Sequence, residues 1–321
     1  MAELLQVRDL KKYFKTPGGL LHAVDNVNFT IGEGKTLGVV GESGCGKSTL
    51  GRTVLGLIDP TDGEVIFKGE DVTFAKGRRR RELRRKMQII FQDPFSSLDP
   101  RKSVFSLIAD PLITYHEYSS KKELNDRVWE LMETVGLAKR LTYSYPHELD
   151  GGRRQRVGVA RALALNPEFI VCDEPVSALD VSIQAQILNL LQDLQEEHGL
   201  TYMFITHDMS VVKHISDDIM VMYVGCVMEK AGEEELFERP LHPYTKGLLS
   251  AVPVPNIHRE KPRVMLRGEL ASPVNPKPGC RFASRCAYAD ERCRREQPAL
   301  EEILPGHFCA CHNTRKINQL L

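Results

Sequence analysis

Apolar and polar residues alternate near the N-terminus of the chain. Val27, Phe29 and Ile31 are each separated by one polar residue, a period of two that is typical of a strand with one buried face. Residues 4–31 are therefore expected to form strands, and the glycine-containing stretch 32–35 a turn. Further short strands are predicted at 36–40, 64–68, 88–91, 169–173, 201–206 and 218–230.

A helical period replaces the alternation in the stretches between these strands. In 183–194, apolar residues recur every three or four positions, as on one face of an amphipathic helix. Strands that alternate with helices along a chain indicate the α/β class. The stretch from about 93 to 160 shows little strand character and is predicted to be a helical insertion into the α/β core. Other helices are predicted at 50–57, within 104–140 and at 153–165.

The pattern changes after residue 232, where prolines become frequent. Prolines interrupt helices and strands, so this segment is not expected to build a large core of its own. The sequence therefore predicts two parts, a first domain at 1–232 and a small proline- and cysteine-rich region at 233–321. The prolines that mark the change are Pro240, Pro243, Pro253, Pro255, Pro262, Pro273, Pro276 and Pro278.

Composition and charge change this picture little. Of the 321 residues, 42% are apolar, which is enough for a substantial core. Lys and Arg together number 43, as do Asp and Glu, so overall charge favours neither nucleic acid nor an anionic surface. The basic run 78–81 has no interleaved aromatic residues and is interpreted as a solvated helix face. No signal-peptide pattern and no apolar run of roughly 18 residues is present, so a membrane role is expected only through partners.

A glycine-rich stretch directly follows the predicted strand 36–40 and precedes a predicted helix. From Gly41 to Thr49 it matches the phosphate-binding loop (P-loop) pattern G-x-x-x-x-G-K-S. Backbone N–H groups of such a loop, and the N-terminus of the helix behind it, face the phosphates of a nucleotide. Lys47 is expected to reach the β- and γ-phosphates, and Ser48 to bind Mg²⁺. The candidate ATP ligands in the loop are Gly41, Ser43, Gly44, Cys45, Gly46, Lys47, Ser48 and Thr49.

Two carboxylates, Asp173 and Glu174, end an apolar run. Beside a P-loop this is the layout of a Walker-B strand, which carries Asp173 to the Mg²⁺ and sets Glu174 next to it. His207 follows the predicted strand 201–206, where a contact to the γ-phosphate would fall, although a lone histidine at a strand end is more often an ordinary surface or core residue. Tyr13 also has two interpretations, a half-buried strand aromatic or an adenine-stacking platform.

Taken together, these motifs resemble the nucleotide-binding subunits of ABC transporters, in the family's order and at its spacings over most of the chain. His242–Tyr244 and the cysteines that follow resemble the C-terminal region of peptide and nickel importers. The closest resemblance is to the ATPases of oligopeptide/dipeptide importers and, of their two paired subunits, to the F-type. The segments that carry it are Gly41–Thr49, Gln92, Leu149–Gln155, Phe169–Glu174, Ser177–Asp180 and His207.

The resemblance implies a P-loop NTPase core with an antiparallel β subdomain, a helical insertion and a small C-terminal region. It also implies that Glu174 orients or activates the attacking water, while Gln92 senses that water and Mg²⁺. The implied site residues are Glu174, His207 and Gln92 for catalysis; Ser48, Gln92 and Asp173 for Mg²⁺; Tyr13 for adenine; Asp180, in the D-loop, for the dimer interface; and Asp150, Gly151 and Gly152 toward the partner's ATP.

The partners follow from the same resemblance. They are a paralogous ATP-binding subunit in a heterodimer, two membrane-spanning permease subunits and an extracytoplasmic peptide-binding protein, with no nucleic acid. The chain would be peripheral at the cytoplasmic face of the membrane, held there by the permeases. The sequence does not encode the transported solute, and peptide is favoured over nickel by the resemblance alone.

One motif departs from the family pattern. The signature L-S-G-G-Q reads Leu-Asp-Gly-Gly-Arg from Leu149 to Arg153, so an aspartate, Asp150, replaces the serine that binds the partner's γ-phosphate. A carboxylate facing a triphosphate is repulsive. We therefore expect an asymmetric heterodimer, in which one ATP site hydrolyses and the other is impaired or structural.

Five of the eight cysteines lie between residues 280 and 311. Thiols stay reduced where a P-loop protein works, so this group is expected to bind metal rather than to form disulfides. Four thiolates suit zinc or an iron–sulfur cluster, but the C-x₂₋₄-C pairs typical of structural zinc are missing. Wide spacing and the resemblance favour a [4Fe–4S] cluster that staples this segment rather than performing redox chemistry. The implied ligands are Cys280, Cys286, Cys293 and Cys311, with Cys309 as the alternative fourth ligand.

Other classes of P-loop protein fit less well. Chromosome-maintenance ATPases separate the two Walker motifs by a very long heptad region, which this chain lacks. Translation-type ABC proteins carry two such domains in one chain, and small-molecule kinases lack the segment 149–152. A scaffold that binds nucleotide without hydrolysis would not need Glu174 and His207.

Overall fold

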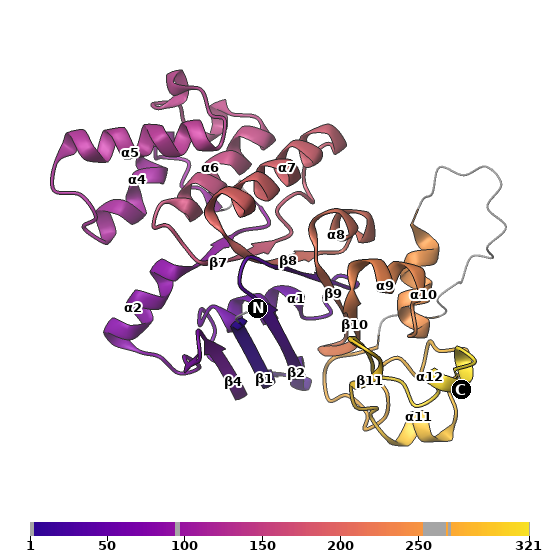
Figure 1. Ribbon diagram of the computed structural model, residues 1–321. Coiled ribbons are helices and arrows are strands. Elements are labelled where there is room, and N and C mark those ends of the chain that lie inside the picture. Colours follow the sequence, from indigo (N-terminus) through magenta and orange to yellow (C-terminus); the bar gives the residue numbers. More distant parts are fainter. Residues whose placement is uncertain (1–2, 94–96, 253–267, 269–270, 321) are drawn as a thin grey trace. The chain divides into compact units, whose positions relative to one another are not determined.

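The computed structural model of the protein describes residues 3–93, 97–252, 268 and 271–320. Two compact units make up the chain (Figure 1). The first unit contains Met1–Phe74 and Phe204–Leu321, and the second contains Ala75–Met203. The first unit therefore holds both the P-loop and the C-terminal cysteines.

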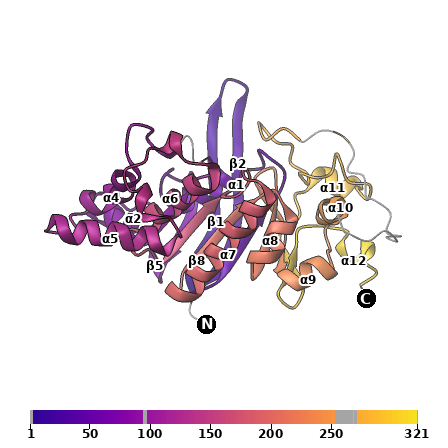
Figure 2. The ribbon, with the colours of Figure 1, turned by 90° about the horizontal axis from the view of Figure 1, so that it is seen from above.

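An antiparallel sheet opens the first unit. Strands β1 (Glu3–Thr16) and β2 (Gly19–Gly32) form a long hairpin, whose strands run side by side in Figure 2. Val7 pairs with Phe29, and Leu10 with Val27, so the alternating apolar residues share one buried face. Strands β4 (Asp62–Phe67) and β5 (Glu70–Asp71) complete the sheet, in the order β2-β1-β4-β5.

A second sheet in the same unit carries the P-loop. Strand β3 (Thr36–Val40) runs parallel to β9 (Asp218–Tyr223), which pairs antiparallel with β10 (Cys226–Gly232). The C-terminal strands β12 (His307–Cys309) and β11 (Glu301–Leu304) extend the sheet, in the order β11-β12-β10-β9-β3. The C-terminal region is thus joined by strand pairing to the sheet that supports the P-loop. The helices of this unit are α1 (Lys47–Val54), α8 (Met209–Ile215), α9 (Glu233–Glu238), α10 (Pro243–Ala251), α11 (Glu291–Arg295) and α12 (Thr314–Ile317).

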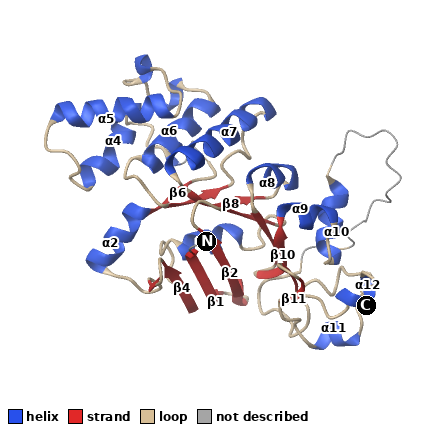
Figure 3. Cartoon of the chain, in the orientation of Figure 1, coloured by secondary structure: helices blue, strands red, loops and turns tan. Residues whose placement is uncertain are grey.

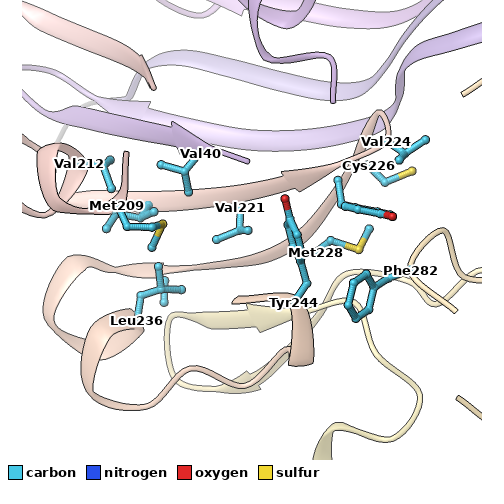
Figure 4. Packing of buried hydrophobic residues seen from close by; sticks show 13 residues of the cluster. Val40, Met209, Val212, Val221, Val224, Cys226, Met228, Leu236, Tyr244 and Phe282 are labelled. Carbon is cyan, nitrogen blue, oxygen red and sulfur yellow. The ribbon is translucent and has the colours of Figure 1, made fainter. Parts of the chain in front are cut away.

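The C-terminal region packs into a core that it shares with these strands. Tyr223 of β9, Tyr244 of α10 and Phe282 are all buried in one cluster, and Figure 4 shows Tyr244 and Phe282 near Met228. The rings of Tyr223 and Phe282 meet edge to face at 5.4 Å between centroids. The proline-rich segment therefore gains its buried surface from strands that precede it in the chain.

The second unit is mainly helical, as the blue helices in Figure 3 show. The helices α4 and α5 begin at serine N-caps, where Ser103 accepts from the N–H of Ser106 and Ser120 accepts from that of Glu123. The last strand, β8 (Thr201–Thr206), carries the chain back into the first unit. The other elements are α2 (Gly77–Lys86), β6 (Met87–Ile90), α4 (Val104–Thr114), α5 (Lys121–Thr134), two short 3₁₀ turns (Lys139–Leu141 and Pro146–Glu148), α6 (Gly151–Leu163), β7 (Phe169–Asp173) and α7 (Val181–His198).

The predicted α/β fold, with an antiparallel β part, is confirmed. Helix α6 begins two residues earlier than expected because Asp150 caps it. The basic run 78–81 lies on α2, a helix whose one buried residue is Leu83, as expected of a solvated face. The division at residue 232 stays a prediction. None of the helices in the described ranges combines the length and apolar character needed to cross a bilayer.

Candidate functional site

The P-loop joins β3 to α1 and requires glycine at specific positions. Gly46 has φ +106°, and a Cβ there would lie 1.9 Å from the carbonyl oxygen of Ala23. Lys47 is 4% exposed, and its Nζ donates to the carbonyl oxygens of Gly41 at 2.7 Å and Glu42 at 3.1 Å. The Lys47 amine therefore lies against the backbone of its own loop, where it can meet the phosphates of a nucleotide.

In the second unit, two parallel strands bring Gln92 and Glu174 together. Strands β6 and β7 are parallel and in register, with Ile90 opposite Cys172, so the residues that follow them emerge at the same edge. Gln92 Nε2 donates to Glu174 Oε2 at 3.0 Å. Glu174 has φ +47°, an uncommon conformation for a non-glycine residue, and such strain is found preferentially at functional sites.

Asp173 lies directly before Glu174 at the end of β7. Asp173 is 1% exposed, so its carboxylate is shielded from water. Buried charges in proteins are paired or coordinate metals, so Asp173 is a candidate ligand for a cation at the end of this strand. The donor chemistry suits Mg²⁺, which prefers carboxylate oxygens.

The signature residues begin helix α6. Asp150 is its N-cap, and its carboxylate accepts from the N–H of Arg153 at 2.8 Å, with Arg153 Nε 3.5 Å from the other oxygen. The Asp150 side chain remains 60% exposed. A Cβ at Gly152 would lie 2.7 Å from a methyl group of Ile183, so glycine is needed for α6 to pack against α7. The exposed helix N-terminus offers N–H groups and a carboxylate together.

The remaining predicted residues lie at the ends of elements. Asp180 is the exposed N-cap of α7 in the second unit. His207 is exposed and directly follows β8 in the first unit. The first unit thus contains Tyr13, the P-loop and His207, and the second contains the Walker-B carboxylates, Gln92, the signature and Asp180.

Tyr13 belongs to a side-chain group that sequence reasoning did not find. Its ring stacks on that of His22, with centroids 4.0 Å apart, and its hydroxyl donates to Asp25 at 2.5 Å. Asp25 also contacts His22 Nδ1 at 3.0 Å and forms an ion pair with Arg281. Although burial opposes ionisation, the hydrogen bonds from Tyr13 and His22 lower the pKa of Asp25. A local motif for this group is absent from the sequence, because Arg281 joins it from far along the chain.

The P-loop itself has contacts to the C-terminal region that the sequence also did not reveal. The hydroxyl oxygen of Tyr244 accepts from the N–H of Glu42 at 2.9 Å. Arg285 binds the Glu42 carboxylate with both terminal nitrogens, at 2.6 and 3.1 Å. Of the two C-terminal residues, Tyr244 stands in a motif that the sequence singled out, His242–Tyr244, and Arg285 does not.

Four of the C-terminal cysteines line one small cavity together with His242 and Phe282. They are Cys280, Cys286, Cys293 and Cys311. Burial, helped by the neighbouring thiols, raises the pKa of Cys280 to about 12. The fifth cysteine, Cys309, is buried apart from this lining and accepts from the Thr314 hydroxyl at 3.4 Å. Across the described ranges, no group of three or more His, Cys, Asp or Glu side chains has the geometry to hold a single metal ion.

Comparisons with known proteins give the chain's relatives. Residues 24–177 match the ABC transporter family, and residues 228–293 match the oligopeptide/dipeptide transporter C-terminal region. The chain is 51% identical to the oligopeptide transport ATP-binding protein AppF of Bacillus subtilis, covering 96% of this chain and 97% of that protein. It is 52% identical to the oligopeptide transport ATP-binding protein OppF of Salmonella typhimurium, covering 92% of this chain and 89% of that protein.

Solved structures of ATP-binding cassettes have the same fold. A dimeric ATP-binding cassette, MJ0796, bound to ADP and Pi after hydrolysis, superposes with a TM-score of 0.66 at 32% identity, over 72% of this chain and 99% of that one. CbiO1 from Clostridium perfringens, part of an ABC transporter complex, gives 0.66 at 28% identity, over 74% and 92% of the two chains. The chain is therefore an ATPase that belongs to the ATP-binding subunits of ABC transporters, in the family with the oligopeptide/dipeptide transporter C-terminal region.

Proposed function

We propose that this chain hydrolyses ATP to drive the import of di- or oligopeptides through an ABC transporter. The observation that carries the proposal is its similarity, over nearly its whole length, to relatives named as oligopeptide transport ATP-binding proteins. The match to the oligopeptide/dipeptide transporter C-terminal region supports the same substrate class.

The test is an uptake assay in cells that lack this chain. Labelled peptides of two to five residues and labelled nickel are offered to the deletion strain, to the strain complemented with the unmodified chain, and to one complemented with Lys47→Ala. Peptide uptake restored only by the unmodified chain is the expected result. Nickel uptake that depends on the chain while peptide uptake does not would assign it to a nickel importer instead.

In the proposed ATP site, the residues of this chain position the nucleotide and the attacking water. Lys47 neutralises charge on the β- and γ-phosphates. Ser48, Gln92 and Asp173 would hold Mg²⁺, which when bound would neutralise more of the phosphate charge. The hydrogen bond from Gln92 orients the Glu174 carboxylate so that its other oxygen can accept a proton from water. Tyr13 supplies the adenine platform and His207 the contact to the γ-phosphate.

The proposed assembly is a head-to-tail heterodimer with a paralogous ATP-binding subunit. Each ATP would lie between one subunit's P-loop and the other's signature, with Asp180 at the interface. Like unit charges ~4 Å apart repel by about 4 kcal/mol at an effective dielectric of ~20. At the partner's P-loop, Asp150 would exert this repulsion on the triphosphate, offset in part by Arg153, which lies against it.

The remaining partners are proposed from the same family. Two permease subunits would hold the chain at the cytoplasmic face of the membrane, and an extracytoplasmic protein would deliver the peptide. Copurification tests this assembly. The tagged chain, extracted in mild detergent, is expected to bring down one further ATP-binding subunit and two membrane-spanning subunits. Recovery of a homodimer without membrane subunits would contradict it.

The four cysteines of the C-terminal cavity are proposed to hold a [4Fe–4S] cluster. The support is that Cys280, Cys286, Cys293 and Cys311 all line one cavity, and that thiolates are the ligands such clusters take. Cys309 lies outside this lining, so Cys311 is the better candidate for the fourth ligand. The cluster would supply cross-links between segments of the C-terminal region.

Cysteine variants test the cluster. After anaerobic purification, iron and sulfide analysis and the visible thiolate-to-iron absorbance are compared between the Cys311→Ser and Cys309→Ser variants. We expect Cys311→Ser to lose iron and Cys309→Ser to keep it. Colourless unmodified protein with stoichiometric zinc would contradict the iron assignment. Iron loss only in Cys309→Ser would make Cys309, rather than Cys311, the fourth ligand.

A further inference from the structure

The loop between the first two cavity cysteines reaches the nucleotide site. We call residues 280–286, Cys-Arg-Phe-Ala-Ser-Arg-Cys, the cysteine loop. Each of its arginines is the direct neighbour of a cavity cysteine, Arg281 after Cys280 and Arg285 before Cys286. Both arginines form ion pairs with acidic residues near the N-terminus of the chain.

Arg285 holds the P-loop. Its two terminal nitrogens bind the two oxygens of Glu42, at 2.6 and 3.1 Å, and Glu42 is the second residue of the P-loop. The Arg285 side chain is 8% exposed and that of Glu42 is 29% exposed, so the pair is largely shielded from water. A bidentate arginine–carboxylate contact fixes orientation as well as distance. It also cancels a negative charge that lies on the loop meant to receive phosphates.

Arg281 acts at the other end of the same site. It pairs with Asp25, and their side chains are 9% and 16% exposed. Asp25 in turn accepts a hydrogen bond from the hydroxyl of Tyr13, whose ring stacks on that of His22. The Asp25 carboxylate thus contacts both members of the aromatic pair, and its counter-charge comes from the cysteine loop.

Backbone hydrogen bonds connect these two ends. The N–H of Asp25 donates to the carbonyl of Gly225 at 2.8 Å, and the N–H of Gly225 donates to the carbonyl of Cys45 at 2.8 Å. Cys45 is part of the P-loop. The Tyr13–Asp25 group and the P-loop are therefore joined through these backbone hydrogen bonds, and the cysteine loop contacts both.

Phe282, between the two arginines, fixes the loop to the core. Its ring lies 5.4 Å from that of Tyr244, whose hydroxyl accepts from the N–H of Glu42 at 2.9 Å. The loop is thereby held by a buried aromatic contact in addition to its two ion pairs. A buried anchor of this kind makes the positions of Arg281 and Arg285 well defined.

We propose that Arg281 and Arg285 are positioning residues of the ATP site, through which the cysteine loop sets the geometry of the adenine platform and of the P-loop. Arg285 keeps Glu42 paired and the P-loop in its binding conformation. Arg281 keeps Asp25 in place to orient Tyr13. The Arg281 half rests on the proposed role of Tyr13 as the adenine platform, and the Arg285 half rests on the P-loop alone.

The test compares ATP with inorganic tripolyphosphate, which has three linked phosphates but neither adenine nor ribose. ATP and inorganic tripolyphosphate are titrated, with Mg²⁺, into the full-length chain by calorimetry. Loss of charge-assisted hydrogen bonds worth ~1.4 kcal/mol corresponds to about a tenfold change in Kd. We expect Arg285→Gln to weaken both ligands about tenfold. We expect Arg281→Gln to weaken ATP about tenfold and to leave tripolyphosphate within about twofold.

Matched variants separate positioning from general damage. Arg292→Gln removes an arginine that also adjoins a cavity cysteine but forms its ion pair with the exposed Glu296, and it is expected to change neither Kd. Adding Glu42→Gln to Arg285→Gln removes the uncompensated charge and is expected to restore part of the tripolyphosphate affinity. Asp25→Asn breaks the other pair from its acidic side and is expected to act like Arg281→Gln. Circular dichroism melting curves accompany each variant.

The outcomes distinguish this inference from the proposed function. If Tyr13→Ala weakens ATP but Arg281→Gln and Asp25→Asn do not, the role of Arg281 is wrong while the adenine platform stands. If Tyr13→Ala leaves ATP binding unchanged, the adenine platform fails and the role of Arg281 fails with it. Unchanged tripolyphosphate binding in Arg285→Gln, or no recovery in the double variant, overturns the role of Arg285.

Discussion

At the scale of single residues, the proposed catalytic carboxylate is held by one hydrogen bond and by its backbone. Glu174 has φ +47° directly after the buried strand β7, and Gln92 donates to it at 3.0 Å. A side chain held in this way is oriented before any substrate binds, which is how positioned bases contribute to catalysis. Lys47, in contrast, lies on the P-loop, where its Nζ donates to the carbonyl oxygen of Gly41, and its proposed role is to bind the phosphates.

Two substitutions separate these roles. Glu174→Gln keeps the shape but removes the charge that orients and activates water, so we expect ATP to bind with unchanged affinity while hydrolysis at this site falls by a factor of about 10² or more. Lys47→Ala is expected to weaken ATP binding itself. Single-turnover hydrolysis and equilibrium binding, measured on the reconstituted complex, distinguish the two. Hydrolysis at the unmodified rate in Glu174→Gln would show that another group is the base.

A buried ion pair joins the C-terminal strand β12 to β10. His307 and Glu229 are both fully buried, and His307 Nε2 lies 2.7 Å from Glu229 Oε1. Glu229 also accepts from the N–H groups of Leu241 and His242, at 2.6 and 2.9 Å. Burial alone would lower the pKa of His307, but the hydrogen bonds and charges of Glu229 and Glu235 raise it above its usual value. The histidine therefore favours its charged form in the folded chain.

This pair predicts a pH dependence with a definite sign. Because the folded-state pKa of His307 is raised, its stabilising contribution is complete below the unfolded value of about 6.5 and is lost as pH rises through the folded value. His307→Gln is expected to cost about 3 kcal/mol at pH 6 and less at pH 9. Urea unfolding at the two pH values, with unmodified protein beside it, measures the difference. An equal cost at both would mean that His307 is neutral in the fold.

At the scale of elements, helix α6 shows how one helix serves both packing and the signature. Its N-cap is Asp150, and its second residue, Gly152, has no room for a side chain because Ile183 of α7 lies against it. Gly158, later in the same helix, would meet nothing within 4 Å if it carried a Cβ. Packing against α7 therefore requires glycine at position 152, whereas position 158 has room for a side chain.

Alanine at these two positions is expected to have opposite effects on stability. At Gly152 a Cβ would lie 2.7 Å from Ile183, so Gly152→Ala is expected to destabilise the chain by about 1–3 kcal/mol. Gly158→Ala is expected to stabilise it by about 0.5–1 kcal/mol, since alanine favours a helix interior where space allows. Chemical denaturation of both variants measures the contrast. Equal effects would show that α6 and α7 do not pack as described.

At the scale of the whole molecule, the proposed heterodimer contains two ATP sites of unequal composition. In this proposal the chain would supply its P-loop and Glu174 to one site and Asp150 to the other. A homodimer would place Asp150 against both triphosphates, which makes a partner with a serine-type signature the more favourable choice. Asymmetry in turnover then follows from a single signature residue.

Paired glutamate variants in the reconstituted complex test this asymmetry. Glu174→Gln in this chain is expected to abolish turnover, whereas the equivalent change in the partner is expected to cost less than about twofold, because the partner's site is already impaired by Asp150. Asp150→Ser keeps an N-capping oxygen and removes the charge. In this variant, turnover is expected to depend on the partner's glutamate as well. Equal losses from the two glutamate variants, or a fully active homodimer, would contradict the asymmetry.

The sequence by itself determined the fold class, the ATP-binding motifs and their family. These features are local: a P-loop needs its glycines, lysine and serine in one contiguous stretch between a strand and a helix, so a linear pattern contains nearly all the required information. The strands and helices were likewise readable because burial on one face imposes a period on consecutive residues.

Only the tertiary structure decided which distant residues support that site. Arg281 meets Asp25 across 256 positions and Arg285 meets Glu42 across 243, and neither pair leaves a periodic signal. These contacts exist because β12 pairs with β10 and Phe282 enters the core beside Tyr244, which brings the cysteine loop back to the P-loop. The shared cavity of four cysteines has the same origin, since strand pairing and core packing, rather than spacing along the chain, set which side chains converge.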